Sequence, residues 1–290
     1  MYKSKRFFND YDAVEDGKNA KTLIEEIVND PEFNELEEIV IGCWGEAWDE
    51  EDAQPMVDYI ADNAQKFSHI KSLFVGDMDY EDCEVSWIMQ ADYTRLWDAM
   101  PQLEKFTVKG SMELTLGLKS HENLKSLEII CGGLPTDVIE EVGNAKLPNL
   151  ETLILYIGVD NYGFDGDINT IKTFLEKSDF PKLKYLGIVD SEIQDEVTEV
   201  VLNCKYMDQI NTLDLSKGTL TDKGGELLID GMKSHPNITK LDLYFHFLSD
   251  DMMEKMKNMA DERGNLEVIL DEKQENEYNG RNYYYAMLTE

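Results

Sequence analysis

Histidine is the commonest general base in enzymes, so the four histidines of this chain are the first candidates for chemistry. Three of them follow a serine, as Ser68-His69, Ser120-His121 and Ser234-His235, each just before a similar run of leucines. A pair that recurs at equivalent places is a feature of the repeat, so we expect these three to be structural loop residues. The fourth, His246, comes two residues after Tyr244 at the end of a predicted strand. An exposed histidine there would tune a contact near neutral pH.

A metal site is the second possibility for chemistry. Asp165, Asp167, Asn169 and Glu176 have the spacing of calcium ligands in an EF-hand loop, but Thr170 stands where the turn of that loop needs glycine. The chain has no HExxH motif, no zinc-like cluster of His and Cys, and no glycine-rich phosphate loop. The sequence therefore predicts a protein that is not an enzyme, with no metal, no cofactor and no catalytic residue.

A repeated phrase defines the elements that would position any other site. The phrase reads Leu-x-x-Leu-x-Leu, with Ile, Val or Phe replacing some leucines, and successive copies start between 21 and 34 residues apart. Such a period is typical of a leucine-rich-repeat solenoid. The longer units carry insertions at 77–87 and 158–167, which we expect to form loops on one face of the solenoid. The copies begin at Leu36, Ile70, Leu103, Leu124, Leu150, Leu183, Ile210 and Ile238, and a degenerate copy begins at Leu266.

The periodicity within each copy predicts a strand followed by a helix. The fourth and sixth residues of the first eight copies are apolar, which is the period of a strand with one buried face. Helical runs follow at 138–145, 197–202, 224–232 and 252–260, and Thr136, Thr221 and Ser249 are suited to cap three of them. We therefore predict one α/β domain over 1–290, a right-handed leucine-rich-repeat horseshoe with a parallel sheet on its concave face and helices on its convex face. Residues 1–35 would cap it, 36–265 hold about eight repeats, and 266–290 form a degenerate repeat and a tail.

The whole chain resembles a family of small bacterial cytosolic leucine-rich-repeat proteins of uncharacterised function. The resemblance is clearest in 82–88 (DCEVSWI), 132–135 (GGLP), 190–193 (DSEI) and 283–286 (YYYA). Repeats near 28 residues with full helices are similar to the ribonuclease-inhibitor type. The turn position that holds Asn or Cys in that type is occupied here by Trp44, Gly132, Ser191, Gly218 and His246. The family implies no activity and no functional residue.

The third, fifth and seventh residues of each phrase should line the concave face. This face carries four acids and three lysines in the sequence, so almost none of the charge of the chain falls on it. Exposed aromatic and aliphatic side chains on a rigid sheet are typical of an interaction surface. Two alternatives stay open, because strand propensity alone favours Val, Ile and Tyr, and because a terminal segment is able to cover the groove. The candidate partner-binding residues are Phe74, Ile130, Ile154, Tyr156, Tyr185, Val189, Tyr244 and His246.

The net charge of the chain limits the classes of partner that it can bind. Sixty acidic residues against 27 basic ones give a net charge of −33, which should repel nucleic acids and anionic membranes and attract basic proteins. The predicted function is recognition of an unidentified protein partner through the concave sheet, and the alternative is an acidic inhibitor that sequesters a basic protein by charge. Four scattered cysteines and the absence of an apolar leader or membrane segment predict a cytoplasmic location.

Overall fold

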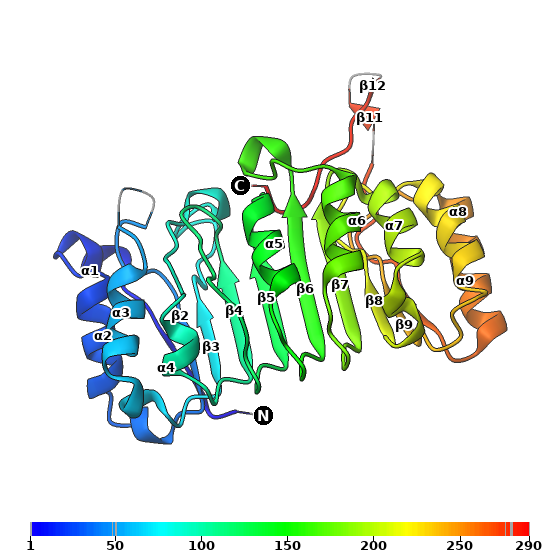
Figure 1. The fold of residues 1–290 in the computed structure, drawn as a ribbon. Helices are drawn as coiled ribbons and strands as arrows, with labels where there is room; N and C mark the ends of the chain where they lie inside the picture. The colour runs from blue at the N-terminus through cyan, green and yellow to red at the C-terminus, as the bar shows by residue number, and fades with distance from the viewer. Residues whose placement is uncertain (1, 48, 50, 276, 279–280, 290) are drawn as a thin grey trace.

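The computed structural model describes residues 2–47, 49, 51–275, 277–278 and 281–289. Within them, one parallel sheet of ten strands runs through the protein, with the strands in the order in which they occur in the chain. Helices cover one face of this curved sheet, and we call the opposite face the open face (Figure 1). The fold class predicted from the repeats is confirmed. The strands are β1 (Ser4–Phe7), β2 (Glu38–Ile41), β3 (Ser72–Val75), β4 (Lys105–Lys109), β5 (Ser126–Ile130), β6 (Thr152–Gly158), β7 (Tyr185–Ser191), β8 (Thr212–Asp214), β9 (Lys240–Asp242) and β10 (Glu267–Ile269).

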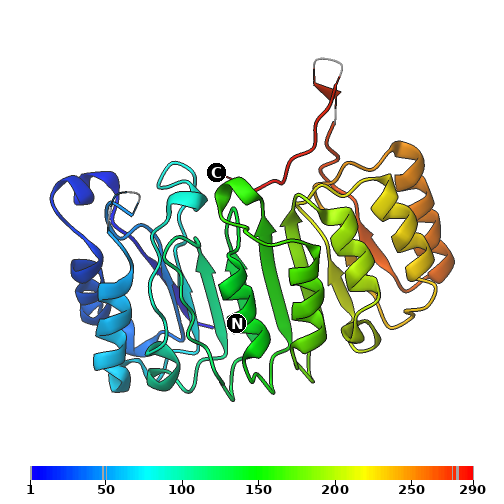
Figure 2. The same ribbon diagram turned by 45° about the horizontal axis from the view of Figure 1, so that its top comes forward.

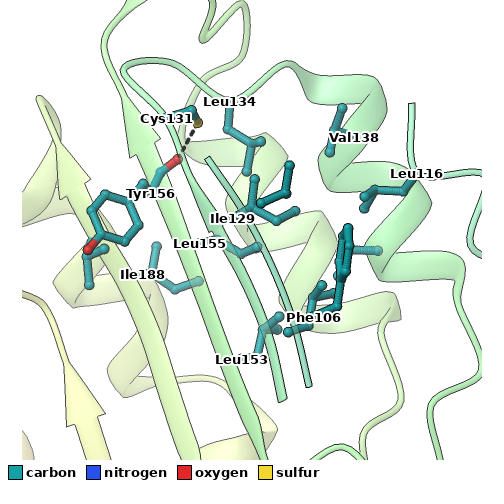
Figure 3. Close-up of a cluster of buried hydrophobic side chains, with 14 of the residues drawn as sticks. Phe106, Leu116, Ile129, Cys131, Leu134, Val138, Leu153, Leu155, Tyr156 and Ile188 are labelled. Atoms are coloured by element: carbon teal, nitrogen blue, oxygen red, sulfur yellow. Dashed lines mark hydrogen bonds between the residues drawn. The ribbon is translucent and has the colours of Figure 1, made fainter. Parts of the chain in front are cut away.

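The core is built as the phrase predicts. The fourth and sixth residues of the first eight copies are buried, and they align from strand to strand, as in the ladder Ile129, Leu155 and Ile188. Figure 3 shows these side chains packed beneath the sheet, with Phe106 and Leu116 from the preceding repeat. Burying a side chain of this size stabilises the fold by about 1.5–3 kcal/mol, so the stacked layers hold the open face in a fixed geometry.

The helices follow the strands and pack side by side. They are α1 (Tyr11–Glu15), α2 (Ala20–Asn29), α3 (Gln54–Asp62), α4 (Leu96–Ala99), α5 (Thr136–Asn144), α6 (Ile168–Lys177), α7 (Gln194–Leu202), α8 (Asp222–Gly231) and α9 (Asp250–Arg263). Thr221 and Ser249 cap α8 and α9 as predicted. Thr136 instead lies inside α5, and the Oδ1 atom of Asp165 from the next repeat accepts its backbone N–H at 2.8 Å. The prediction for Thr136 is wrong because a carboxylate from a neighbouring loop performs the capping.

One repeat has no helix. The copies at Leu103 and Leu124 start only 21 residues apart, which leaves too little chain for a helix after β4. An extended segment takes the position of the helix, and isolated β-bridges join Met89 to Met112 and Asp92 to Thr115. Leu114, Leu116 and Leu118 are buried at alternate positions of this stretch. The loop 76–92 is thereby tied to the loop that follows β4.

The two ends of the sheet differ from the repeats. At the amino end, β1 pairs with β2 although it precedes the first phrase. At the other end, the chain leaves β10, forms a small hairpin of β11 (Glu277–Tyr278) and β12 (Arg281–Asn282), and turns back. Figures 1 and 2 show the chain then crossing the carboxyl ends of the strands and ending beside the loop that follows β6. We call residues 283–289 the C-terminal segment.

Candidate protein-binding site

The strand register places the predicted concave positions in continuous rows on the open face. The fifth residues of the phrases pair from strand to strand, so that Phe74, Glu128 and Ile154 belong to one row with Asp214 and Asp242. The third residues form the neighbouring row, which includes Tyr185. Residues distant in sequence are therefore brought onto one surface by the register alone.

A tyrosine and an aspartate from adjacent strands form the centre of this face. The hydroxyl of Tyr185 donates a hydrogen bond to Oδ2 of Asp214 at 2.6 Å, and the backbone N–H of Ser216 donates to Oδ1 at 3.0 Å. Burial and the negative charge of Asp214 raise the pKa of Tyr185, so the phenol stays protonated as a donor. Because both oxygens of the carboxylate are bonded, the Tyr185 ring is held in one position.

A lysine and a second tyrosine extend this network. The ammonium of Lys217 lies 5.2 Å from the centre of the Tyr156 ring, within the range of a cation–π contact. Tyr156 is only 7% exposed, and burial raises the pKa of its phenol. Burial likewise raises the pKa values of Glu128 and Asp242. The open face therefore carries both signs of charge, with Glu128, Asp214 and Asp242 in one row and Lys105 and Lys240 in the neighbouring row.

The C-terminal segment covers the carboxyl end of this face. Its backbone N–H groups bind the protein at two places, since Met287 donates to the carbonyl of Lys217 and Leu288 donates to Oδ1 of Asp190, both at 2.8 Å. A Cβ placed on Gly132 would lie 2.7 Å from the carbonyl oxygen of Thr289, so the segment passes close to that glycine. Upstream, Tyr284 and Tyr285 pack edge-on against Phe247 at ring-centre distances of 5.2 and 5.4 Å.

Three of the predicted partner-binding residues are buried, so the expectation that they are accessible is wrong, and Tyr156 at 7% exposure is one of them. Val189, which precedes Asp190 in the chain, is fully buried, and so is His246. The expectation of an exposed His246 at the rim is therefore wrong. Its Nδ1 atom accepts the backbone N–H of Leu248 at 3.1 Å, and its Nε2 atom lies 3.2 Å from the carbonyl of Leu270. Burial lowers the pKa of its imidazole, so it serves as a neutral structural bridge.

The remaining predicted residues stay accessible. Phe74, Ile130, Ile154, Tyr185 and Tyr244 are each partly exposed, and we call these five the open-face patch. Tyr156 lies between them and the covered end. The patch runs over β3 and β5–β7 to Tyr244, the second residue after β9.

Two residues of this region were not among the sequence candidates. Asp190 and Lys217 both have positive φ angles, 57° and 68°, and Phe245 has 60° at the same place in the next repeat. Each is the eighth residue of its phrase. This turn presents the Lys217 carbonyl and the Asp190 side chain to the C-terminal segment.

The imidazoles of His69 and His121 have structural partners. Nε2 of His69 lies 2.8 Å from the carbonyl of Phe33, and Nδ1 of His121 accepts the backbone N–H of Leu124 at 3.0 Å. The expectation that these two are structural is confirmed. The described residues contain no group of three or more His, Cys, Asp or Glu side chains arranged to hold a metal. Nor does any helix in the described part of the chain have the length and apolar character needed to cross a bilayer.

This sheet, with its repeated buried phrase and its single layer of helices, defines a leucine-rich-repeat protein. A crystal structure of a protein from Bacteroides fragilis matches it with a TM-score of 0.88 and 39% sequence identity, over 99% of this chain and 77% of the other. The chain belongs to the same family as that protein. An internalin from Listeria monocytogenes matches with a TM-score of 0.41 and 16% identity, over 86% of this chain and 64% of its own, too weakly to inform function. No protein-family model and no curated protein matches the sequence.

Proposed function

We propose that this protein is a non-catalytic recognition module that binds a protein partner through the open-face patch. The observation that carries the proposal is the group of partly exposed aromatic and aliphatic side chains that the register holds in neighbouring rows on a rigid sheet. Such side chains contribute most of the binding energy in protein interfaces, and tyrosine is prominent among them.

The network beneath the patch supports this function. Tyr185 is fixed by Asp214, and Tyr156 lies under Lys217. A side chain that is already held in place loses little conformational entropy when a partner binds. The balanced charges of the face add specificity, because a partner must match both the carboxylates and the lysines.

The second candidate function is an acidic inhibitor that sequesters a basic protein by charge. The net charge of −33 favours it. The two functions differ in salt dependence, since contacts between exposed charges weaken as the Debye length falls from about 8 Å at 0.15 M to about 3 Å at 1 M salt. An apolar patch keeps its partner at high salt.

Affinity capture with matched variants separates the two. The test variant is Phe74→Ala/Tyr185→Ala/Tyr244→Ala, which spares the buried Tyr156. The control variant, Glu140→Ala/Lys172→Ala/Glu199→Ala, changes exposed residues of α5, α6 and α7. Capture of a discrete protein that survives 1 M salt and is lost only in the test variant supports the open-face patch. Capture that both variants retain and 1 M salt abolishes supports the inhibitor.

We also infer a cytosolic location and repeats of the ribonuclease-inhibitor type. The thiols of Cys43, Cys83 and Cys131 are free and buried, in keeping with a reducing compartment. The repeats that begin at Ile210 and Ile238 start 28 residues apart, and each carries a full helix after its strand. Labelling with a thiol reagent after unfolding, in freshly lysed cells of the native host, tests the location. Thiols that label fully, unlike those of the oxidised protein, support a reducing compartment.

A further inference from the structure

The exposed large hydrophobic residues lie on one edge of the molecule. Among the described residues they all belong to loops or segments at the carboxyl ends of the strands, which we call the carboxyl rim. None of them lies on the turns that enter the strands. They are Phe8, Tyr11, Tyr80, Trp87, Met112, Tyr283, Tyr284, Tyr285 and Met287. Apolar surface gathered on one edge marks an interaction site more strongly than the same residues scattered singly.

The centre of this rim is a cleft of about 400 Å³ between the two inserted loops. Trp87 from the first insertion and Tyr162 from the second line it, with Met112 and Pro135 between them. Trp87 is 53% exposed and Met112 is 42% exposed. Large exposed side chains around a cavity of this size can surround a side chain of a partner.

The cleft is held open by backbone contacts between its loops. The hydroxyl of Ser111 donates to the carbonyl of Gly133 at 2.8 Å, and the backbone N–H of Gln90 donates to the carbonyl of Met112 at 2.8 Å. A Cβ on Gly133 would lie 2.5 Å from the backbone of Tyr162. Loops that follow β3, β4, β5 and β6 are thereby joined into one rigid wall.

The charge of these four loops has a single sign. The stretches 76–92, 110–117, 131–137 and 158–167 contain no Lys, Arg or His. Their charged residues are Asp77, Asp79, Glu81, Asp82, Glu84, Asp92, Glu113, Asp137, Asp160, Asp165 and Asp167. The open face, by contrast, mixes lysines with its acids. An aromatic cleft set in purely acidic loops is complementary to a cation that carries apolar surface.

The rim already binds one guanidinium of the protein itself in this way. The Nε atom of Arg6 donates to Oδ2 of Asp77 at 2.6 Å, and its Cζ atom lies 4.4 Å from the centre of the Phe8 ring. A carboxylate and an aromatic ring thus hold an arginine at the end of the same rim. Arg6 also lies 3.7 Å from Asp82 of the loop that carries Trp87. Glu81 and Glu84, on either side of Cys83 in that loop, have no Lys or Arg within the loop to pair with.

We propose that the carboxyl rim is a second binding site, in which the cleft at Trp87 and Met112 takes an extended, arginine-bearing segment of a protein partner. An arginine side chain stacks on Trp87, and the acids of the inserted loops bind the neighbouring cations. This site is separate from the open-face patch, and it stands or fails independently of the function proposed for that patch.

The probe that tests it is a fluorescein-labelled peptide of about ten residues in which Arg and Leu alternate. The control is a peptide of the same length in which Gln replaces each Arg. Fluorescence anisotropy at about 150 mM salt measures its affinity, where charges more than about 8 Å apart are largely screened. The variants Trp87→Ala/Met112→Ala and Glu81→Lys/Glu84→Lys each alter the rim. The variant Glu122→Lys/Asp179→Lys makes the same change of net charge at exposed residues of the opposite edge.

We expect the Arg-Leu peptide to bind and the Gln-Leu peptide not to bind. Both rim variants should weaken binding about tenfold or more, as loss of an interface anchor does, while the opposite-edge variant stays within about twofold. Equal weakening by both charge variants would mean a diffuse attraction and would overturn the site. Unchanged binding by the Trp87→Ala/Met112→Ala variant, or no binding by the native protein at about 1 mM peptide, would overturn it as well. Triple replacement of Phe74, Tyr185 and Tyr244 by Ala should leave the peptide affinity unchanged, which separates this result from that of the open-face patch.

Discussion

Oδ1 of Asp190 accepts the backbone N–H of Leu288 at 2.8 Å, although the two residues are 98 positions apart in the chain. Asp190 is fully buried and has a φ angle of 57°, a conformation that favours Gly, Asn and Asp. Leu288 packs against the hydrophobic core at the same place. This contact fastens the C-terminal segment over the carboxyl ends of the central strands and sets the boundary of the open-face patch.

Replacing Gly132 with Ala should release the end of the C-terminal segment. The added Cβ would lie 2.7 Å from the carbonyl oxygen of Thr289, which is backbone and can only move away. Amide hydrogen exchange of residues 283–289 should become at least about tenfold faster, as expected for a segment that opens locally. The amides of α2 provide the internal reference, and unchanged exchange at 283–289 would mean that the segment is not held at Gly132.

The burial of Asp190 should make stability depend on pH. Burial raises the pKa of its carboxyl well above the ordinary value, so the folded state binds this proton more tightly than the unfolded state. The free energy of unfolding should therefore increase as the pH falls from 8 towards 5, and the benefit is complete below the unfolded pKa near 4. Burial gives Glu128 and Asp242 shifts of the same sign.

The variant Asp190→Asn measures how much of the pH dependence of stability comes from Asp190. Asparagine keeps the acceptor oxygen and tolerates the positive φ angle, but it carries no charge. We expect a higher melting temperature than that of the native protein at pH 8 and a smaller change between pH 8 and pH 5. A variant with an unaltered pH slope would show that the Asp190 carboxyl does not titrate in this range.

The bond between Tyr185 and Asp214 should contribute to stability. Replacing Tyr185 with Phe removes the donor at 2.6 Å and leaves an oxygen of the buried Asp214 carboxylate without it. Hydrogen bonds to charged groups contribute about 1.5–3 kcal/mol, so urea unfolding should show a loss near the lower end of this range. Tyr80→Phe, at a residue that is 72% exposed, is the matched control and should change stability by less than about 0.5 kcal/mol.

The overall charge should make the fold sensitive to salt. A net charge of −33 repels itself, and the repulsion weakens as the Debye length shortens. The melting temperature should rise between about 10 and 500 mM sodium chloride. The salt bridges between surface residues, such as that of Arg95 with Asp58 at 2.7 Å, are too weak to reverse this trend. A flat response would count against strong repulsion.

The repeats are predictable from the sequence because each phrase encodes its own strand and buried layer. The open-face rows follow from the same period, since the register is fixed wherever one face of a strand is buried. β1 is not predictable in this way, because Ser4–Phe7 lacks the phrase and pairs only through its backbone. His246 is buried through contacts with Leu248 and with Leu270 of the next repeat, which the strand period does not encode. No local sequence pattern predicts such contacts. The residue types of Asp190 and Lys217 do not indicate their positive φ angles either.

The most direct test of the account is photo-crosslinking of the full-length protein in its native host. A photoreactive phenylalanine replaces Phe74 or Tyr244 on the open face in two variants, and Lys172 on α6 in a third. Recognition through the open face predicts one discrete protein adduct that the Phe74 and Tyr244 variants share and the Lys172 variant lacks. Adducts only at Lys172, or the same adducts at all three positions, would contradict recognition through the open face.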